Sequence, residues 1–172
     1  ISFVGKDVTV EEVFKELSKY KAFYESYGGG ITASGGEPML RHSFISKLFK
    51  LAHKEGIHTA VDTSGAVSFD AFEEVLENTD CVLYDIKFKS DEMHRKYTGQ
   101  GNKLILENLI KIADKIRKGD NIELWIRTPL IPTLTGSKEN ITEIAEFIRD
   151  NLMDVISRWE LCTFNKACQN KY

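Results

Sequence analysis

The chain has 172 residues, the size of one domain, of which 42% are hydrophobic and 28% charged. Its net charge of −3, with no long block of one sign, argues against a nucleic-acid-binding protein and against a membrane-surface protein. No apolar run approaches the ~20 residues that cross a bilayer, and no signal peptide is visible, so we expect no membrane association. Three scattered cysteines do not suggest a disulfide framework; they fit a reducing compartment, and we expect a cytoplasmic protein.

Hydrophobic periodicity predicts helices that alternate with short strands. Thr9 is a plausible N-cap, with Glu12 as its capping-box partner, for a first helix that runs to about Tyr24. Further helices are expected at about 43–54, 68–77 and 102–118 and after Ser137, whereas 88–101 is a polar segment. Strands are expected at about 31–34, 58–61, 81–84, 122–126 and 157–162.

This order of elements predicts the fold class. Alternating βα units imply a parallel sheet with right-handed crossovers, and strands that are apolar throughout are typical of sheets covered on both faces. Neither GxGxxG after the first strand nor GxxxxGK[ST] occurs. We therefore predict an α/β protein that forms a partial (βα)6-type TIM barrel rather than a dinucleotide-binding fold.

Polar residues follow the predicted strands, where ligands bind in parallel βα folds. Since all strands run the same way, these residues should meet at one mouth. The mouth would offer carboxylates, a lysine, an arginine and exposed backbone groups, a combination that suits a zwitterionic ligand. The residues are Gly35, Gly36, Glu37, Asp62, Thr63, Ser64, Asp85, Lys87, Arg127 and Asn165.

Each of these signals also has a simpler structural interpretation. The glycine pair could be only a tight βα turn, and Asp62 could cap the turn that follows it. Asp85 and Lys87 could form a structural ion pair, although two residues apart on a strand they share one face. Arg127 is harder to explain in this way, because a charge after an apolar strand needs a partner such as a carboxylate or a phosphate.

Histidine and cysteine spacing does not predict a metal site. The four histidines show no metal-ligand spacing, and we interpret them as surface or internally satisfied side chains. Cys162 and Cys168 lie further apart than a typical metal-binding pair, so we interpret the cysteines as free thiols.

Four segments, in order and spacing, carry a family resemblance. They are GGITASGGEP at 29–38, KEGIHTAVDTSG at 54–65, LYDIK at 83–87 and WIR at 125–127. Together they resemble the glycyl-radical-enzyme activating enzymes of the pyruvate formate-lyase type, within the radical S-adenosylmethionine (SAM) superfamily. The resemblance covers nearly the whole chain.

The resemblance implies an oxidoreductase. Such an enzyme cleaves SAM reductively to a 5′-deoxyadenosyl radical, which removes hydrogen from a glycine of a partner glycyl radical enzyme. It implies a [4Fe-4S] cluster as cofactor, SAM bound at that cluster, and a flavodoxin- or ferredoxin-type electron donor. By motif, it assigns the methionine amino group of SAM to Gly35, Gly36 and Glu37, and other SAM contacts to Ser64, Lys87, Arg127 and Asn165. It assigns a monovalent cation to Asp62, Thr63 and Asp85.

One family motif is absent. The CxxxCxxC that holds the cluster does not occur in this sequence, and the three cysteines do not replace it. In relatives that motif precedes the part that resembles residues 1–7, and many members carry a ferredoxin-like insert between the two. We therefore expect residues 1–172 to be one partial-barrel core without the first βα unit, unable to bind the cluster and inactive alone.

Two other interpretations stay open. One is a cluster-less regulatory protein that binds SAM or the partner. The other is an unrelated barrel enzyme, such as an aldolase or a phosphate-binding lyase. The latter would need a Schiff-base lysine within a strand or a glycine-rich phosphate loop near the last strands, and neither is apparent.

Overall fold

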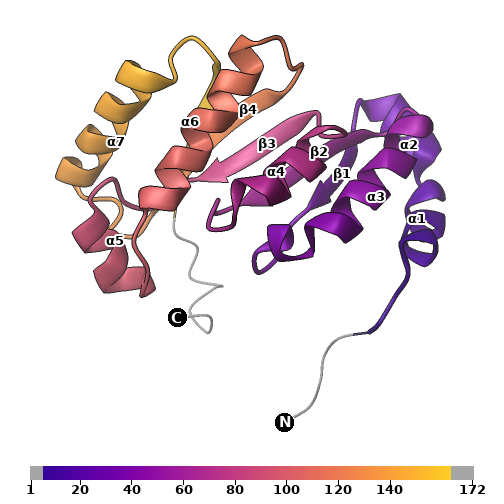
Figure 1. Ribbon diagram of the computed structural model, residues 1–172, viewed down its shortest axis with the longest axis horizontal. Helices are drawn as coiled ribbons and strands as arrows, with labels where there is room; N and C mark the ends of the chain where they lie inside the picture. Colours follow the sequence, from indigo (N-terminus) through magenta and orange to yellow (C-terminus); the bar gives the residue numbers. More distant parts are fainter. Residues whose placement is uncertain (1–5, 164–172) are drawn as a thin grey trace.

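In the computed structural model, which describes residues 6–163, a parallel sheet carries helices along one face (Figure 1). The strands are β1 (Gly30–Ala33), β2 (His58–Thr63), β3 (Cys81–Asp85), β4 (Glu123–Leu130) and β5 (Ile156–Thr163). The α-helices are α1 (Val10–Ser18), α2 (Lys21–Tyr27), α3 (His42–Lys54), α4 (Phe69–Leu76), α5 (Asp91–Thr98), α6 (Lys103–Arg117) and α7 (Lys138–Asn151). A short 3₁₀ helix, η1 (Pro38–Arg41), precedes α3.

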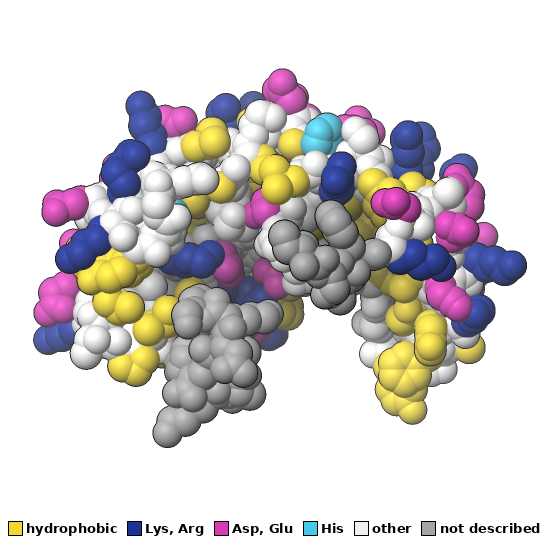
Figure 2. Space-filling view, turned by 90° about the horizontal axis from the view of Figure 1, so that it is seen from below, with side chains coloured by type: hydrophobic (Ala, Val, Ile, Leu, Met, Phe, Trp, Pro, Cys, Tyr) yellow, Lys and Arg dark blue, Asp and Glu magenta, His cyan; other side chains and the backbone are white. Residues whose placement is uncertain are grey.

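The sheet has the strand order β1-β2-β3-β4-β5, and every neighbouring pair is parallel. Within the described residues β1 does not pair with β5, so the sheet stays open. The molecule has the shape of an arch, hollowed on the side away from the helices (Figure 2). The predicted α/β fold with a partial barrel is confirmed.

The hydrophobic core lies between the sheet and the helices. On the three central strands, the fully buried side chains that point to the helices include Val61, Val82, Tyr84, Leu124 and Ile126. Helices α3, α4, α6 and α7 cover them with Phe49, Phe72, Leu109, Ile112 and Ile144. Removing this apolar surface from water is the main force that holds the helices on the sheet.

The opposite face of the sheet, here called the inner face, carries both charged and apolar side chains. Side chains alternate along a strand, so residues between the core positions point away from the helices. They are half-buried and include Asp62, Leu83, Asp85, Trp125 and Arg127. The expectation of strands apolar on both faces is therefore wrong, because helices cover one face and the other lines the hollow of the arch (Figures 1 and 2).

The predicted first helix is two helices. The capping box of Thr9 and Glu12 is present, as expected. However, α1 ends at Ser18, whose hydroxyl donates to the carbonyl of Phe14 at 2.7 Å. The next amides bond three residues back, as in a 3₁₀ turn, before α2 begins at Lys21.

A helix was missed in the polar segment. Helix α5 lies within 88–101, with Ser90 as N-cap and Gly99 in the left-handed conformation at its end. Only one of its residues, His94, is buried. Hydrophobic periodicity could not reveal such a helix, although the capping residues at both ends could have done so.

None of the helices in residues 6–163 is both long enough and apolar enough to span a bilayer.

We expect Gly65 to be essential for packing at the end of β2. It has φ +75°, and a Cβ there would lie 1.8 Å from the hydroxyl oxygen of Tyr84. Gly56 has a similar φ of +68°, but its Cβ would meet nothing within 4 Å. G56A should cost about 1 kcal/mol for the left-handed conformation. G65A should cost about 3 kcal/mol or more, because overpacking adds to the same strain. Urea unfolding followed by circular dichroism measures both, and equal losses would contradict the steric explanation.

Candidate functional site

The carboxyl ends of the strands converge on one edge of the inner face. Register sets which side chains are neighbours: Asp85 on β3 lies opposite Arg127 on β4, and Arg127 lies opposite Glu160 on β5. In Figure 2, acidic and basic side chains lie side by side on the inner side of the arch. The mouth predicted from sequence therefore exists for β1 to β4.

Glu37 ties the loop after β1 to the end of β2. One carboxylate oxygen accepts from the Met39 amide at 3.1 Å and the Thr63 hydroxyl at 2.7 Å. The other oxygen accepts from the Ser64 amide at 2.9 Å and the Ser64 hydroxyl at 2.5 Å. Each oxygen thus has two donors, which is about its full capacity. Glu37 therefore fixes the geometry of the mouth and has no free acceptor site for a ligand in this arrangement.

The glycine pair beside Glu37 forms a turn that borders open space. Gly35 has φ +89° and Gly36 has φ +57°, and a Cβ at either position would meet nothing within 4 Å. Glycine is needed here for its backbone conformation rather than for a close contact within the chain. The turn leaves its backbone accessible at the mouth.

Asp62 and Arg127 form an ion pair across the inner face. Arg127 Nη1 lies 3.0 Å from Asp62 Oδ2, and both side chains are largely shielded, with 29% and 24% exposed. Ser34 donates to the same Asp62 oxygen at 3.2 Å. Burial lowers the pKa of Arg127, but Asp62 and Cys162 more than offset this, so its pKa is raised and the guanidinium stays charged. Asp62 does not cap the turn after it; the Thr63 hydroxyl accepts from the Gly65 amide instead.

Asp85 and Lys87 are the ion pair that their spacing allowed, with Lys87 Nζ 3.2 Å from Asp85 Oδ2. Burial raises the pKa of the Asp85 carboxyl, and Lys87 only partly opposes it. A carboxylate whose burial costs free energy is typical of binding sites, because it contributes little to the stability of the fold.

Sequence reasoning missed the contribution of β5. Glu160 Oε2 lies 3.5 Å from Arg127 Nε, and Glu160 Oε1 lies 3.3 Å from Arg158. Arg158 in turn lies over the Trp125 ring, 4.0 Å from its centroid. The signal was present, because charges at 158 and 160 alternate with Trp159 at the period of a strand. We call Ser34, Asp62, Asp85, Lys87, Arg127, Arg158 and Glu160 the inner-face network.

Two buried N–H groups on this face make no hydrogen bond among the described residues: Trp125 Nε1 has no acceptor, and Arg127 Nε has only the ion pair with Glu160 at 3.5 Å. Buried donors without partners are uncommon in folded proteins. An oxygen-bearing ligand on the inner face would satisfy them, so the donor set fits a carboxylate or hydroxyl-rich molecule.

The residues expected to hold a monovalent cation do not form one cluster. Asp62 and Asp85 face the hollow and pair with cations, whereas Thr63 is 2% exposed and donates to Glu37. Adjacent residues on a strand point to opposite faces, which separates Asp62 from Thr63. Residues 6–163 contain no group of three or more His, Cys, Asp and Glu side chains that could hold a metal ion. Asn165 lies outside the described residues.

The described cysteines do not fit an iron–sulfur cluster. Cys81 is buried at the start of β3, and burial raises the pKa of its thiol to about 12. Cys162 is half-buried on β5 and, like Cys81, is a free thiol. Cluster ligands are thiolates, and a Cys81 thiol of this pKa stays protonated at neutral pH.

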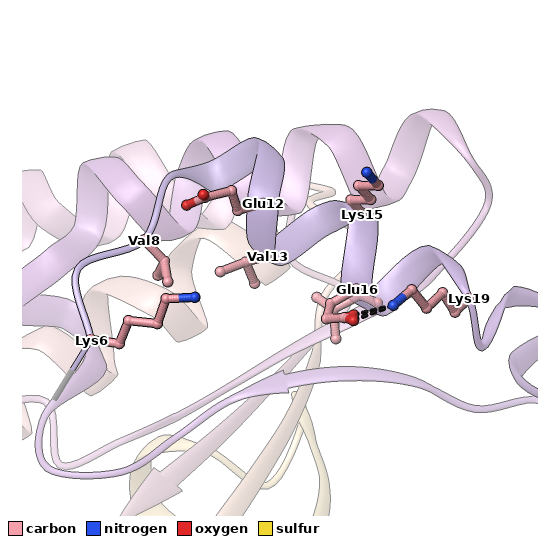
Figure 3. A pocket seen from close by; sticks show the side chains of 8 residues that line it. Lys6, Val8, Glu12, Val13, Lys15, Glu16 and Lys19 are labelled. Carbon is pink, nitrogen blue, oxygen red and sulfur yellow. Dashed lines mark hydrogen bonds and ion pairs between the residues drawn. The ribbon is translucent and has the colours of Figure 1, made fainter. Parts of the chain in front are cut away.

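A groove along α1 is lined by none of the residues of the inner-face network (Figure 3). It has a volume of about 510 Å³ and lies between residues 6–8 and α1, with Val8, Val13 and Leu17 among its lining residues. Its charged groups include Glu16 and Lys19, which form an exposed ion pair with each other. No set of polar groups converges there, so the groove is not our candidate site.

The fold and the inner face belong to a known class. The family model described as the radical SAM superfamily matches residues 2–148, so this chain belongs to that superfamily. The resemblance inferred from the sequence motifs is thereby confirmed.

Within the superfamily, the similar relatives are activating enzymes. The pyruvate formate-lyase-activating enzyme of Clostridium pasteurianum is 39% identical over 98% of this chain and 67% of its own length. The (2S)-3-sulfopropanediol dehydratase activating enzyme of Klebsiella oxytoca is 38% identical over 100% and 53%. The chain thus spans about half to two thirds of the length of these curated relatives.

A solved structure agrees. A domain of a pyruvate-formate lyase-activating enzyme from Bacteroides vulgatus superimposes with a TM-score of 0.68 and 29% identity, over 83% of this chain and 89% of that one. The SAM-bound SuiB of Streptococcus suis has the same TM-score of 0.68 but 16% identity, and so supports the fold alone.

We expect E37A to loosen the mouth. The change removes the acceptor of the Thr63 and Ser64 groups, and each buried donor left without a partner costs about 1–3 kcal/mol. The free energy of unfolding should therefore fall by about 2–4 kcal/mol in urea. E16A is the matched control, because Glu16 is exposed on α1 and its loss should change stability by less than about 0.5 kcal/mol. Equal effects of the two substitutions would show that Glu37 does not hold the loop after β1 to the end of β2.

We expect D85N to stabilise the chain without ligand at neutral pH. The folded-state pKa of Asp85 is raised, so the unfolded chain releases this proton first as pH rises. The contribution of Asp85 to stability therefore falls between the unfolded and the folded pKa, and D85N removes that loss. The urea midpoint of D85N should exceed that of the wild type at pH 7, and the difference should shrink below pH 3.8, the ordinary value for aspartate. A lower midpoint at pH 7 would show that the pair with Lys87 outweighs burial.

Proposed function

We propose that this chain binds SAM at the carboxyl ends of β1 to β4 and is the core of a glycyl-radical-enzyme activating enzyme. The observation that carries the proposal is the 39% identity to a pyruvate formate-lyase-activating enzyme over 98% of the chain. The four segments that carry the family resemblance also supply the mouth of the inner face. The proposed reaction is the reductive cleavage of SAM to a 5′-deoxyadenosyl radical, which abstracts hydrogen from a glycine of the partner enzyme.

The inner face supports SAM as the ligand. SAM presents a carboxylate, an amino group and ribose hydroxyls. Lys87 and Arg127 would hold the carboxylate, and Trp125 Nε1, a buried donor that makes no hydrogen bond among the described residues, suits an oxygen acceptor. The open turn at Gly35 and Gly36 would offer backbone contacts to the amino group.

We propose different tasks for two groups of these residues. Glu37 and Ser64 already bond to each other, so we assign them the task of shaping the mouth rather than of contacting SAM directly. Asp62 and Asp85 already pair with Arg127 and Lys87, so a bound SAM carboxylate would share these cations with them.

Cluster binding is assigned to no residue of this chain, because the described cysteines do not fit it. The alternative function is that of a cluster-less protein that binds SAM or the partner and regulates it. For the enzyme, we propose that the partner is a glycyl radical enzyme, that a flavodoxin or a ferredoxin donates the electron, and that the reaction occurs anaerobically in the cytoplasm.

The test is the iron and sulfide content of the complete gene product, purified without oxygen, together with SAM binding by equilibrium dialysis. We expect about four irons or more per chain, SAM binding, and 5′-deoxyadenosine formation after reduction. The matched control is the triple variant C81S/C162S/C168S, which should keep its iron if cluster ligands lie outside this chain. SAM binding without iron would favour the regulatory protein. Absence of both iron and SAM binding would contradict the enzyme and the SAM-binding form of the regulatory protein.

A further inference from the structure

The segment that carries Lys87 leaves the sheet just after β3. The Ile86 amide makes the last hydrogen bond between β3 and β4, donating to the carbonyl of Arg127 at 2.8 Å. The backbone groups of the next three residues have no strand to pair with. Since buried backbone groups are almost always hydrogen-bonded, side chains must satisfy them.

Asn102, just before α6, satisfies one side of this segment. It is 2% exposed, and its side-chain amide donates to the carbonyls of Phe88 and Lys89, both at 2.8 Å. Its own backbone amide donates to Asp91 at 2.8 Å, which fixes Asn102 relative to α5.

Asn140, in the first turn of α7, satisfies the other side. It is 6% exposed, and its Nδ2 donates to the carbonyls of Lys87 at 2.9 Å and Thr135 at 2.8 Å. Its Oδ1 accepts from the Lys89 amide at 3.2 Å. All of its side-chain polar atoms are therefore used, which offsets the cost of burying an amide.

Asn140 is not needed to begin its helix. Ser137 already caps α7, with its hydroxyl accepting from the Asn140 amide at 3.2 Å. The side chain of Asn140 instead points back to a loop 53 residues earlier in the sequence. Helix capping does not explain a buried polar residue at this position.

Lys87 lies in the backbone segment that the two asparagines hold. Phe88 is 3% exposed and stacks on Tyr97 at 5.5 Å, so it belongs to the helical side. Lys87, between the buried Ile86 and Phe88, points to the inner face, where its Nζ lies 3.2 Å from Asp85 Oδ2. A rotation of the held backbone would move this ammonium away from the mouth.

We propose that Asn140 is a positioning residue for Lys87, and that it sets the affinity of the site for the carboxylate of SAM. This inference rests on the proposed function, in which Lys87 holds that carboxylate. The side chain of Asn140 acts on the ligand only through the Lys87 backbone.

The first measurement is SAM affinity by equilibrium dialysis, with the complete gene product. N140A should bind SAM about tenfold more weakly, the change expected for the loss of one good hydrogen bond. T79V is the matched control: Thr79 is 3% exposed and donates to the Val75 carbonyl at 2.8 Å, but it lies at the opposite edge of the sheet. T79V should leave the affinity unchanged, and an equal loss in both variants would overturn the inference.

A double-mutant cycle separates positioning from general stability. If Asn140 acts through Lys87, N140A should have little further effect on SAM affinity in a K87A background. An undiminished tenfold loss on top of K87A would show that Asn140 acts by another route. If N140A does not fold, N140S, which keeps at most part of the hydrogen bonding, takes its place in the cycle.

Amide hydrogen exchange tests the same contact without ligand. In N140A, peptides that cover 86–90 should exchange faster than in the wild type, while T79V should leave them unchanged. Unchanged exchange in N140A would overturn the positioning role. A wild-type protein that does not bind SAM would instead overturn the proposed function and the ligand of this site, and exchange would still decide whether Asn140 holds the segment.

Discussion

The two-residue alternation of the parallel strands is the constraint on which the whole molecule depends. On β3, Val82 and Tyr84 enter the helical core, and Asp85 therefore faces the hollow. The same alternation on β4 buries Ile126 and turns Arg127 inward. A shift of one residue in the register would bury the charges and expose the core, so hydrophobic packing on one face enforces the polar arrangement on the other.

The inner-face network is held together by pairs that gain little from being buried. Asp62 and Arg127 are both about three-quarters shielded, and shielded ion pairs often cost as much in lost hydration as they gain by attraction. Such an arrangement makes more sense as a prepared site than as a source of stability. The packing that supports it comes from outside the network: Glu37 holds the β1 and β2 ends together, and buried asparagines hold the segment after β3.

Local patterns were enough to predict the five strands, most of the helices between them, the capping box at Thr9 and the polar strand ends. They could not predict which ends contact each other, because Asp62 and Arg127 lie 65 residues apart and meet only through the register of two strand pairs. Helix α5 escaped notice because it buries only His94. The role of Glu37 as a tie, rather than a free carboxylate, depends on donors 26 and 27 residues away. The motif resemblance identified the family, but the hydrogen-bond and ion-pair partners of each side chain could be seen only in the structure.

The balance of charge in the inner-face network has a kinetic consequence. Its three carboxylates, Asp62, Asp85 and Glu160, are matched by Lys87, Arg127 and Arg158, and each cation lies within 3.5 Å of a carboxylate. Paired charges produce a field that fades within a short distance, and salt screens what remains. A charged ligand is therefore not drawn to this edge from afar. Encounter by diffusion should depend little on ionic strength, and discrimination should begin only once the ligand is in contact.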